Sequence, residues 1–279
     1  MHESFLRYRG FRWLKISLGI LAGALALYLR DPASDRRGGT PAGYALGTVC
    51  ALLVLWLMWF GVRKRQYSAR GPDLRGWLSG HVYLGGLLLV LVPLHAAFRF
   101  GPNLHTAAAV LLAAVVVSGL VGAVVYTVVP DRMTRNRSGQ KLDALLEQVA
   151  DVDAECNQLA ATLPTPVARA VAANIAETRI GGGLVVQLTG YLARCPTTEA
   201  LRVVRAHSEE ATDGARELRE RLARLLERLV VKRTVLARVR RDVRLKALLD
   251  VWLVLHVPLA VATLVAVTAH VFVVLSYYR

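Results

Sequence analysis

Two stretches of the sequence decide the fold: residues 81–95 read HVYLGGLLLVLVPLH, and residues 256–270 read HVPLAVATLVAVTAH. Each stretch is an apolar run that begins and ends with histidine, and the interval between the two histidines is 14 residues in both. Ionisable residues are rare inside membrane-spanning helices, and those that occur there usually serve a function. The repeated interval is therefore the central observation about this sequence.

The two stretches belong to a set of five apolar segments, each long enough to cross a bilayer, which requires about 20 residues. The composition agrees, because 54% of the 279 residues are hydrophobic and the mean hydropathy is +0.41. The sequence predicts an all-α, polytopic membrane protein whose residues 1–130 hold four spans and whose residues 246–279 hold the fifth. The expected spans cover about 13–29, 42–62, 77–98, 104–129 and 247–276.

The distribution of basic residues predicts the orientation. Lys and Arg are more numerous before the first span, between the second and third, and in residues 131–245 than in the other connections. Because cytoplasmic connections are enriched in these residues, we expect a bacterial-type inner membrane protein with its N-terminus and residues 131–245 in the cytoplasm and its C-terminus outside. The same bias explains the net charge of +15, so nucleic-acid binding is not expected.

Residues 131–245 are expected to form a cytoplasmic helical hairpin between the fourth and fifth spans. Apolar residues recur at alternating steps of three and four over Leu142–Leu163 and again over Leu218–Val243, the spacing of coiled-coil helices. Pro164 ends the first arm, and Lys232 occupies a position in the second apolar seam, where it is expected to weaken the packing locally. The insertion is interpreted either as a solvated stalk or as a docking surface for a cytoplasmic partner or a second copy of the chain.

Helix geometry places the four span histidines at two levels. At about 1.5 Å and 100° per residue, 14 residues separate two side chains by roughly 21 Å along the axis and leave them within about 40° of one face. The third and fifth spans are expected to run in the same direction. His81 and His256 should therefore share the inner half of the membrane, and His95 and His270 the outer half.

Two facing imidazoles at one level are the axial ligands that a bis-histidine haem requires. The pattern predicts two non-covalent b-type haems in a four-helix bundle, the inner iron bound by His81 and His256 and the outer iron by His95 and His270. Small residues should occur where each disc packs, and Gly85 with Gly86 meets this expectation in the third span. The three cysteines show no C-x-x-C-H arrangement, which excludes covalently attached c-type haem; they are Cys50, Cys156 and Cys195.

Two alternatives to haem stay open, a metal transport path and a proton relay. A metal path would be expected to add carboxylates or closely spaced ligands, and the third and fourth spans contain neither Asp nor Glu. Arg99, beside the outer histidine, is expected either to pair with a haem propionate or only to determine topology. His105 begins the fourth span and is expected to be a solvated interfacial histidine, with a role at a quinone or in proton transfer as the alternative.

The two histidine-bounded stretches resemble the haem-bearing helices of membrane di-haem b-type cytochromes. That group includes the cytochrome b of quinol–cytochrome c reductases and the membrane domain of ferric reductases and NADPH oxidases. The resemblance covers the third to fifth spans. It departs from ferric reductases because no sixth span or C-terminal flavin and NADPH domain is seen, so we expect the chain not to take hydride from NADPH by itself. The insertion at 131–245 is foreign to both relatives.

The resemblance implies an electron-transfer subunit rather than a self-contained enzyme. It would carry electrons across the membrane within a multi-component oxidoreductase, from a quinol or a cytoplasmic donor to an acceptor on the opposite face. The expected partners are the other subunits of this complex, quinone and the lipid bilayer, with a homodimer as an alternative. Two other functions stay open: a ferric reductase-like enzyme fed by a separate dehydrogenase, and a non-redox, membrane-anchored coiled-coil scaffold, sensor or transporter with structural histidines.

Overall fold

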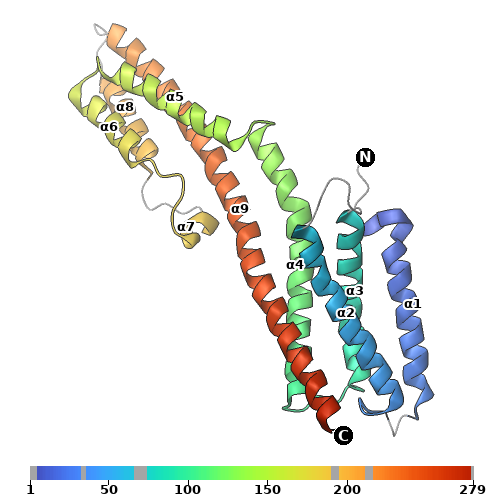
Figure 1. Ribbon diagram of the computed structural model, residues 1–279. Helices are drawn as coiled ribbons and strands as arrows, with labels where there is room; N and C mark the ends of the chain where they lie inside the picture. The colour runs from blue at the N-terminus through green and yellow to red at the C-terminus, as the bar shows by residue number, and fades with distance from the viewer. Residues whose placement is uncertain (1–4, 33–35, 66–73, 190–194, 211–215, 278–279) are drawn as a thin grey trace. The chain divides into compact units, whose positions relative to one another are not determined.

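The computed structural model describes residues 5–32, 36–65, 74–189, 195–210 and 216–277 (Figure 1). In these ranges the secondary structure consists of nine α-helices and one short 3-10 helix, Phe5–Arg7, without strands. Five helices are long and apolar enough to cross a membrane. These findings confirm the predicted all-α class and the presence of five helices that are long and apolar enough to span a membrane.

The chain divides into two compact units. The first, which we call the membrane unit, comprises Met1–Val124 and Trp252–Arg279, and the second, the insertion unit, comprises Val125–Val251. Helices α4, Leu104–Arg137, and α9, Arg216–Tyr277, each contribute residues to both units. Both helices are longer than the spans that hydropathy alone predicts, because the polar residues after the apolar run of α4 and the amphipathic residues before that of α9 are also helical.

Helix α3, Leu74–His95, lies at the centre of the membrane unit and contacts both α1, Tyr8–Arg30, and α2, Pro41–Arg65. Its leucines form the middle of the core, and Leu88 and Leu91 are fully buried. Histidines near both ends of α3 are therefore held by the best-packed helix of the unit.

Glycines on α3 allow the close approach of its neighbours. A Cβ added at Gly76 would lie 2.8 Å from Cζ of Tyr8, and one at Gly80 would lie 2.7 Å from Cη2 of Trp56. Small residues at helix interfaces permit such packing in membrane proteins. Here the space is taken by aromatic rings of α1 and α2.

The end of α3 differs from the sequence-based boundary at residue 98. The helix stops at His95 because Ala97 and Phe98 have left-handed backbone angles, with φ of 47° and 57°. The Phe98 N–H then donates to the Pro93 carbonyl at 2.9 Å, the hydrogen bond of a Schellman cap. His95 is consequently the last residue of the helix.

The insertion unit contains four further helices: α5, Leu142–Ala160; α6, Thr165–Glu177; α7, Leu184–Thr189; and α8, Pro196–Glu210. Residues of α5, α6 and α8 share a core with α9, whereas α7 has no buried residue. The two predicted seams do face each other, since Leu145 and Val149 of α5 pack with Leu236 and Val239 of α9. Further along, α6 and α8 also enter the core, so the insertion is more than the expected hairpin. The buried residues of this second cluster are Val152, Cys156, Ala160, Leu163, Val167, Val171, Ala200, Leu201, Val204, Leu222, Leu225 and Leu229.

Lys232 is fully buried in this unit. Its ammonium forms an ion pair with Asp153 at 2.6 Å and donates hydrogen bonds to the Thr178 hydroxyl at 3.0 Å and the Asn174 carbonyl at 3.4 Å. Asn174 Oδ1 also accepts a hydrogen bond from Thr197 at 2.9 Å. Lys232, which the sequence predicts to weaken the packing of the seam, thus has three partners for its ammonium group.

Candidate functional site

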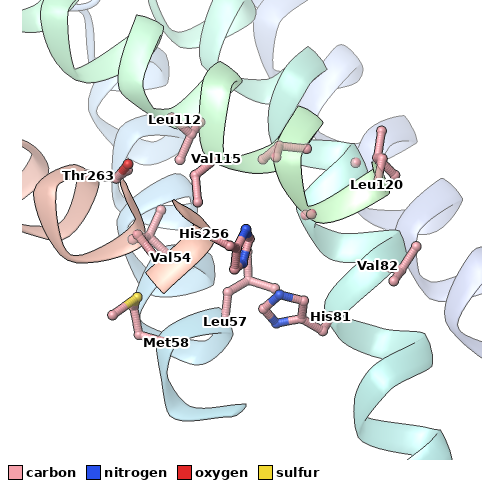
Figure 2. A pocket seen from close by; sticks show the side chains of 15 residues that line it. Val54, Leu57, Met58, His81, Val82, Leu112, Val115, Leu120, His256 and Thr263 are labelled. Atoms are coloured by element: carbon pink, nitrogen blue, oxygen red, sulfur yellow. The ribbon is translucent and has the colours of Figure 1, made fainter. Parts of the chain in front are cut away.

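The structure brings the histidines of the spans together in two pockets, both within the membrane unit. His81 of α3 and His256 of α9 line the first, a cavity of about 70 Å³ that we call the two-histidine pocket (Figure 2). Apart from the imidazoles and Thr263, its walls are apolar. They are formed by Val54, Leu57, Met58, Val82, Gly85, Gly86, Leu112, Val115, Val116, Gly119, Leu120 and Ala260.

Small residues of α4 position His256. The His256 ring stacks on Trp252, with centroids 4.8 Å apart, and its Nδ1 lies 3.2 Å from the Ser118 hydroxyl. Trp252 in turn donates its indole N–H to the Ser118 carbonyl at 2.8 Å. Gly122 makes room for the indole, since an added Cβ would lie 2.0 Å from Trp252 Cζ2. With Nδ1 engaged, Nε2 is the nitrogen of His256 that remains for a ligand.

Nδ1 of His81 lacks the corresponding partner, although the His81 ring has a backbone hydrogen bond with Leu57. Its Nδ1 is buried and makes no hydrogen bond, while its ring lies 4.9 Å from the ring of Phe60. Buried side-chain nitrogens are nearly always hydrogen-bonded, so an exception calls for an explanation such as an absent ligand. The two-histidine pocket therefore presents imidazole nitrogens with incomplete coordination.

The second pocket, which we call the three-histidine pocket, holds His95 and His270 and also His105 at the start of α4. Ring centroids of His95 and His270 are 6.3 Å apart, and His105 lies 5.3 Å from the first and 4.8 Å from the second. Nδ1 of His105 is 3.3 Å from Nε2 of His270. His105, for which we expect a solvated interfacial position, is a half-buried ring that also contacts His95 and His270.

The short connection between α3 and α4 explains the position of His105. It spans residues 96–103, so the start of α4 must lie at the same level as the end of α3. The signal was present in the sequence as a third histidine only ten residues after His95. Hydropathy could not reveal it, since a residue at a helix start is as readily solvated as it is turned inward.

The three-histidine pocket is much larger than the first, about 690 Å³. The predicted residue Arg99 lines it together with Arg37, and both arginines are exposed. His95 is held there by α2: its Nδ1 lies 2.7 Å from the Gly43 carbonyl, and a Cβ at Gly47 would lie 2.7 Å from its Cε1. The geometry again leaves Nε2 of the histidine for a ligand.

The structure thus brings His81 to His256 and His95 to His270, as the spacing predicts, and it places Gly85 and Gly86 beside the first pair. The chemistry of these pockets has to be argued from their own residues. No family model, curated protein or solved structure matches the chain.

Two cysteines of the insertion unit differ in their acidity. Burial raises the pKa of Cys156 to about 11. Burial also acts on Cys195, but hydrogen bonds from Arg240 and Thr198 outweigh it and lower the pKa of that thiol to about 7. Arg240 Nη1 lies 3.6 Å from Cys195 Sγ. Cys195 is thus the more readily ionised thiol of the two.

Proposed function

We propose that the chain is a di-haem b-type cytochrome subunit, which carries electrons across the membrane within a multi-component oxidoreductase. One observation carries the proposal: histidines with equal spacing on two helices meet in two pockets, His81 with His256 and His95 with His270. Opposed imidazoles on neighbouring helices are the ligand set of a bis-histidine haem.

The three-histidine pocket suits a haem in volume and charge. Its 690 Å³ lies within the range of about 300–1,000 Å³ that is typical of sites for small molecules and cofactors. His95 and His270 supply the axial nitrogens, and Arg37 with Arg99 supplies positive charge for carboxylate groups such as propionates.

The two-histidine pocket suits a haem in its donors but not in its volume. A cavity of about 70 Å³ is far smaller than a macrocycle requires. Its apolar side chains, Leu57 and Val115 among them, would have to move apart. Gly85, Gly86 and Gly119 leave three places on its wall without a side chain, which lowers the number of groups that must move.

Residues around the ligands have defined roles in this proposal. When bound, haem iron supplies one-electron oxidation and reduction. The Gly43 carbonyl and the Ser118 hydroxyl hold Nδ1 of His95 and His256; such partners fix the tautomer and orientation of a ligand. The apolar walls exclude water, which is one of the factors that set a haem potential.

A second function is favoured by the size of the three-histidine pocket and by its exposed arginines. A reductase of the ferric reductase-like kind would accept a small anionic oxidant there, with electrons from a separate dehydrogenase. Turnover of ferric chelates by the purified chain with an artificial donor would distinguish this enzyme from a subunit that only carries electrons.

The test of the proposal is a reduced-minus-oxidised spectrum of the full-length protein from haem-replete cells, with haem quantified per chain. We expect two b-type haems. One haem would restrict the proposal to the three-histidine pocket and remove transfer across the membrane through this chain. Absence of haem, with a known b-type cytochrome loaded in the same cells, would overturn the proposal.

A further inference from the structure

The third histidine gives the larger pocket a ligand that a bis-histidine haem does not need. His95, His105 and His270 come from α3, α4 and α9, and one ligand nitrogen of each lies within 4.8 Å of the other two. Three imidazoles from three separate helices converge on one point, at which the sequence prediction had placed only two.

One of the three nitrogen–nitrogen distances matches a tetrahedral metal centre, and the others lie within 4.8 Å. Zinc–nitrogen bonds of about 2.0–2.1 Å imply roughly 3.3–3.4 Å between two nitrogens on one tetrahedral ion. Nδ1 of His105 and Nε2 of His270 are 3.3 Å apart. A hydrogen bond between two imidazoles also explains this one distance. The third ring, His95, is held by the Gly43 carbonyl with its centroid 5.3 Å from that of His105 and 6.3 Å from that of His270.

The residues around the cluster restrict the kind of ion. The cavity wall contains neither Asp nor Glu among its described residues, so hard cations such as Mg²⁺ and Ca²⁺ find no carboxylate there. Neutral imidazoles favour Zn²⁺, Cu²⁺, Ni²⁺ and Co²⁺. The Gly43 carbonyl, 2.7 Å from Nδ1 of His95, is the outer-shell acceptor that metal-bound histidines usually have.

We propose that His95, His105 and His270 bind one first-row transition-metal ion of this class, with a fourth coordination position open to the 690 Å³ cavity. Three protein ligands and one open position are the pattern of reactive zinc sites rather than closed structural ones. Arg37 and Arg99 are exposed, which screens their repulsion of the cation. Their charge favours an anion at the fourth position.

The inference goes beyond the proposed function and does not depend on it. A haem at this pocket would use nitrogens of His95 and His270, so haem and metal ion exclude each other. A substitution of His105 distinguishes metal binding from haem binding, since His105 completes the metal site and is not an axial ligand of the haem.

The experiment titrates Co²⁺ into the full-length protein, produced in haem-depleted cells and purified through a tag without histidines. We expect one Co²⁺ per chain with the visible spectrum of a tetrahedral ion, displaced by Zn²⁺. His105→Ala should weaken Co²⁺ binding by at least about 100-fold, because even the loss of an outer-shell partner costs 10–100-fold. His207→Ala, in the insertion unit, is the matched control and should bind Co²⁺ as the wild type does.

Haem loading of the same variants distinguishes the two proposals. His105→Ala should keep its haem, whereas His95→Ala should lose both the metal ion and the haem of this pocket. A wild type that binds Co²⁺ but no haem would overturn the proposed function alone. An octahedral spectrum, no binding by the wild type, or unchanged affinity in His105→Ala would overturn the metal site.

Discussion

In the insertion unit the buried ammonium of Lys232 meets the Asp153 carboxylate at 2.6 Å, whereas in the membrane unit the buried Nδ1 of His81 meets no hydrogen-bonding partner. The imidazoles of the three-histidine pocket are better provided for, since His95 meets the Gly43 carbonyl and His105 meets His270, with no acidic residue among the described residues of the wall.

The haem and the metal ion that we propose would explain this difference: Lys232 has partners within the protein, whereas the imidazoles would bind a ligand. A buried polar network gains stability from each partner that its members find. The Lys232 ammonium finds three, although Nδ2 of the neighbouring Asn174 makes no hydrogen bond. In the two pockets four imidazoles make one hydrogen bond each, and Nδ1 of His81 makes none. A metal ion or a haem iron, bound as we propose, would add an interaction at the nitrogens that are left.

The largest effect is expected from removing one ligand. His95→Ala should abolish haem binding in the three-histidine pocket and leave the other haem, halving the haem per chain, while His256→Ala should affect only the two-histidine pocket. Pyridine haemochrome quantitation of the full-length variants measures this. Retention of both haems in either variant would show that the replaced histidine is not a haem ligand. The contrast between the partnered Lys232 and the histidines that need a ligand would then fail.

Breaking the ion pair between Lys232 and Asp153 should lower the stability of the insertion unit by about 3–5 kcal/mol, because the buried ammonium that remains loses its counter-charge. Asp153→Ala should therefore lower the free energy of opening of α5 and α9 in the insertion unit, measured by amide hydrogen exchange of the full-length protein. The neighbouring Asp151 is exposed, so Asp151→Ala is the control and should change that energy by less than about 0.5 kcal/mol. Equal effects would show that Lys232 does not depend on Asp153.

An intermediate effect is expected at Gly122, where an added Cβ would lie 2.0 Å from Cζ2 of Trp252. Gly122→Ala should destabilise the packing of α4 on α9 by about 1–3 kcal/mol, the usual cost of overpacking. Its thermal unfolding midpoint in detergent should fall. The control is Gly61→Ala on α2, where the added Cβ meets nothing within 4 Å; a fall of the same size there would remove the packing explanation.

A smaller effect is expected when an uncompensated imidazole is replaced by an apolar side chain. His81→Leu removes a buried nitrogen that makes no hydrogen bond. The haem-free protein should therefore keep its stability within about 1 kcal/mol, while haem binding in the two-histidine pocket is lost. If thermal unfolding shows His81→Leu to be as damaging as Asp153→Ala, the histidine is structural and the contrast between the units fails.

The smallest effect concerns Cys195. Burial raises the pKa of its thiol, but hydrogen bonds from Arg240 and Thr198 lower it to about 7. Because only the thiolate is alkylated, Cys195 should react with iodoacetamide faster as the pH rises through 7, and well before Cys156, whose pKa is about 11. Arg240→Gln removes a stabilising charge and should shift this rise to higher pH, with several-fold slower labelling at neutral pH. Mass spectrometry of the labelled peptides measures the rates, and an unchanged pH profile would contradict the role of Arg240.

Local periodicity predicts much of this protein. The five spanning helices follow from apolar runs, and the meeting of His81 with His256 follows from the regular rise and rotation of a helix. The facing seams of the insertion, such as Val149 opposite Val239, also follow from their repeat. These features depend on residues of one helix at a time.

Features that depend on contacts between helices were missed. The carboxylate opposite Lys232 is 79 residues away in sequence, and nothing in the seam pattern selects it. The volumes of the two pockets depend on which side chains of α2 and α4 face inward, so equal histidine spacing gave no indication of their tenfold difference. The third histidine was missed for the same reason, because its partners lie on other helices.

Helix α9 supplies one histidine to each pocket, and this has a consequence for biosynthesis. The ribosome makes His81 and His95 first, then the whole insertion, and only afterwards His256 and His270. At about 5–20 residues per second, roughly 10 to 30 s separate the synthesis of His95 from that of His256. During this interval the two-histidine pocket has one of its two histidines and the three-histidine pocket has two of its three. A haem or metal ion bound as we propose, with one ligand from α9, could therefore be fully coordinated only after the insertion has been translated.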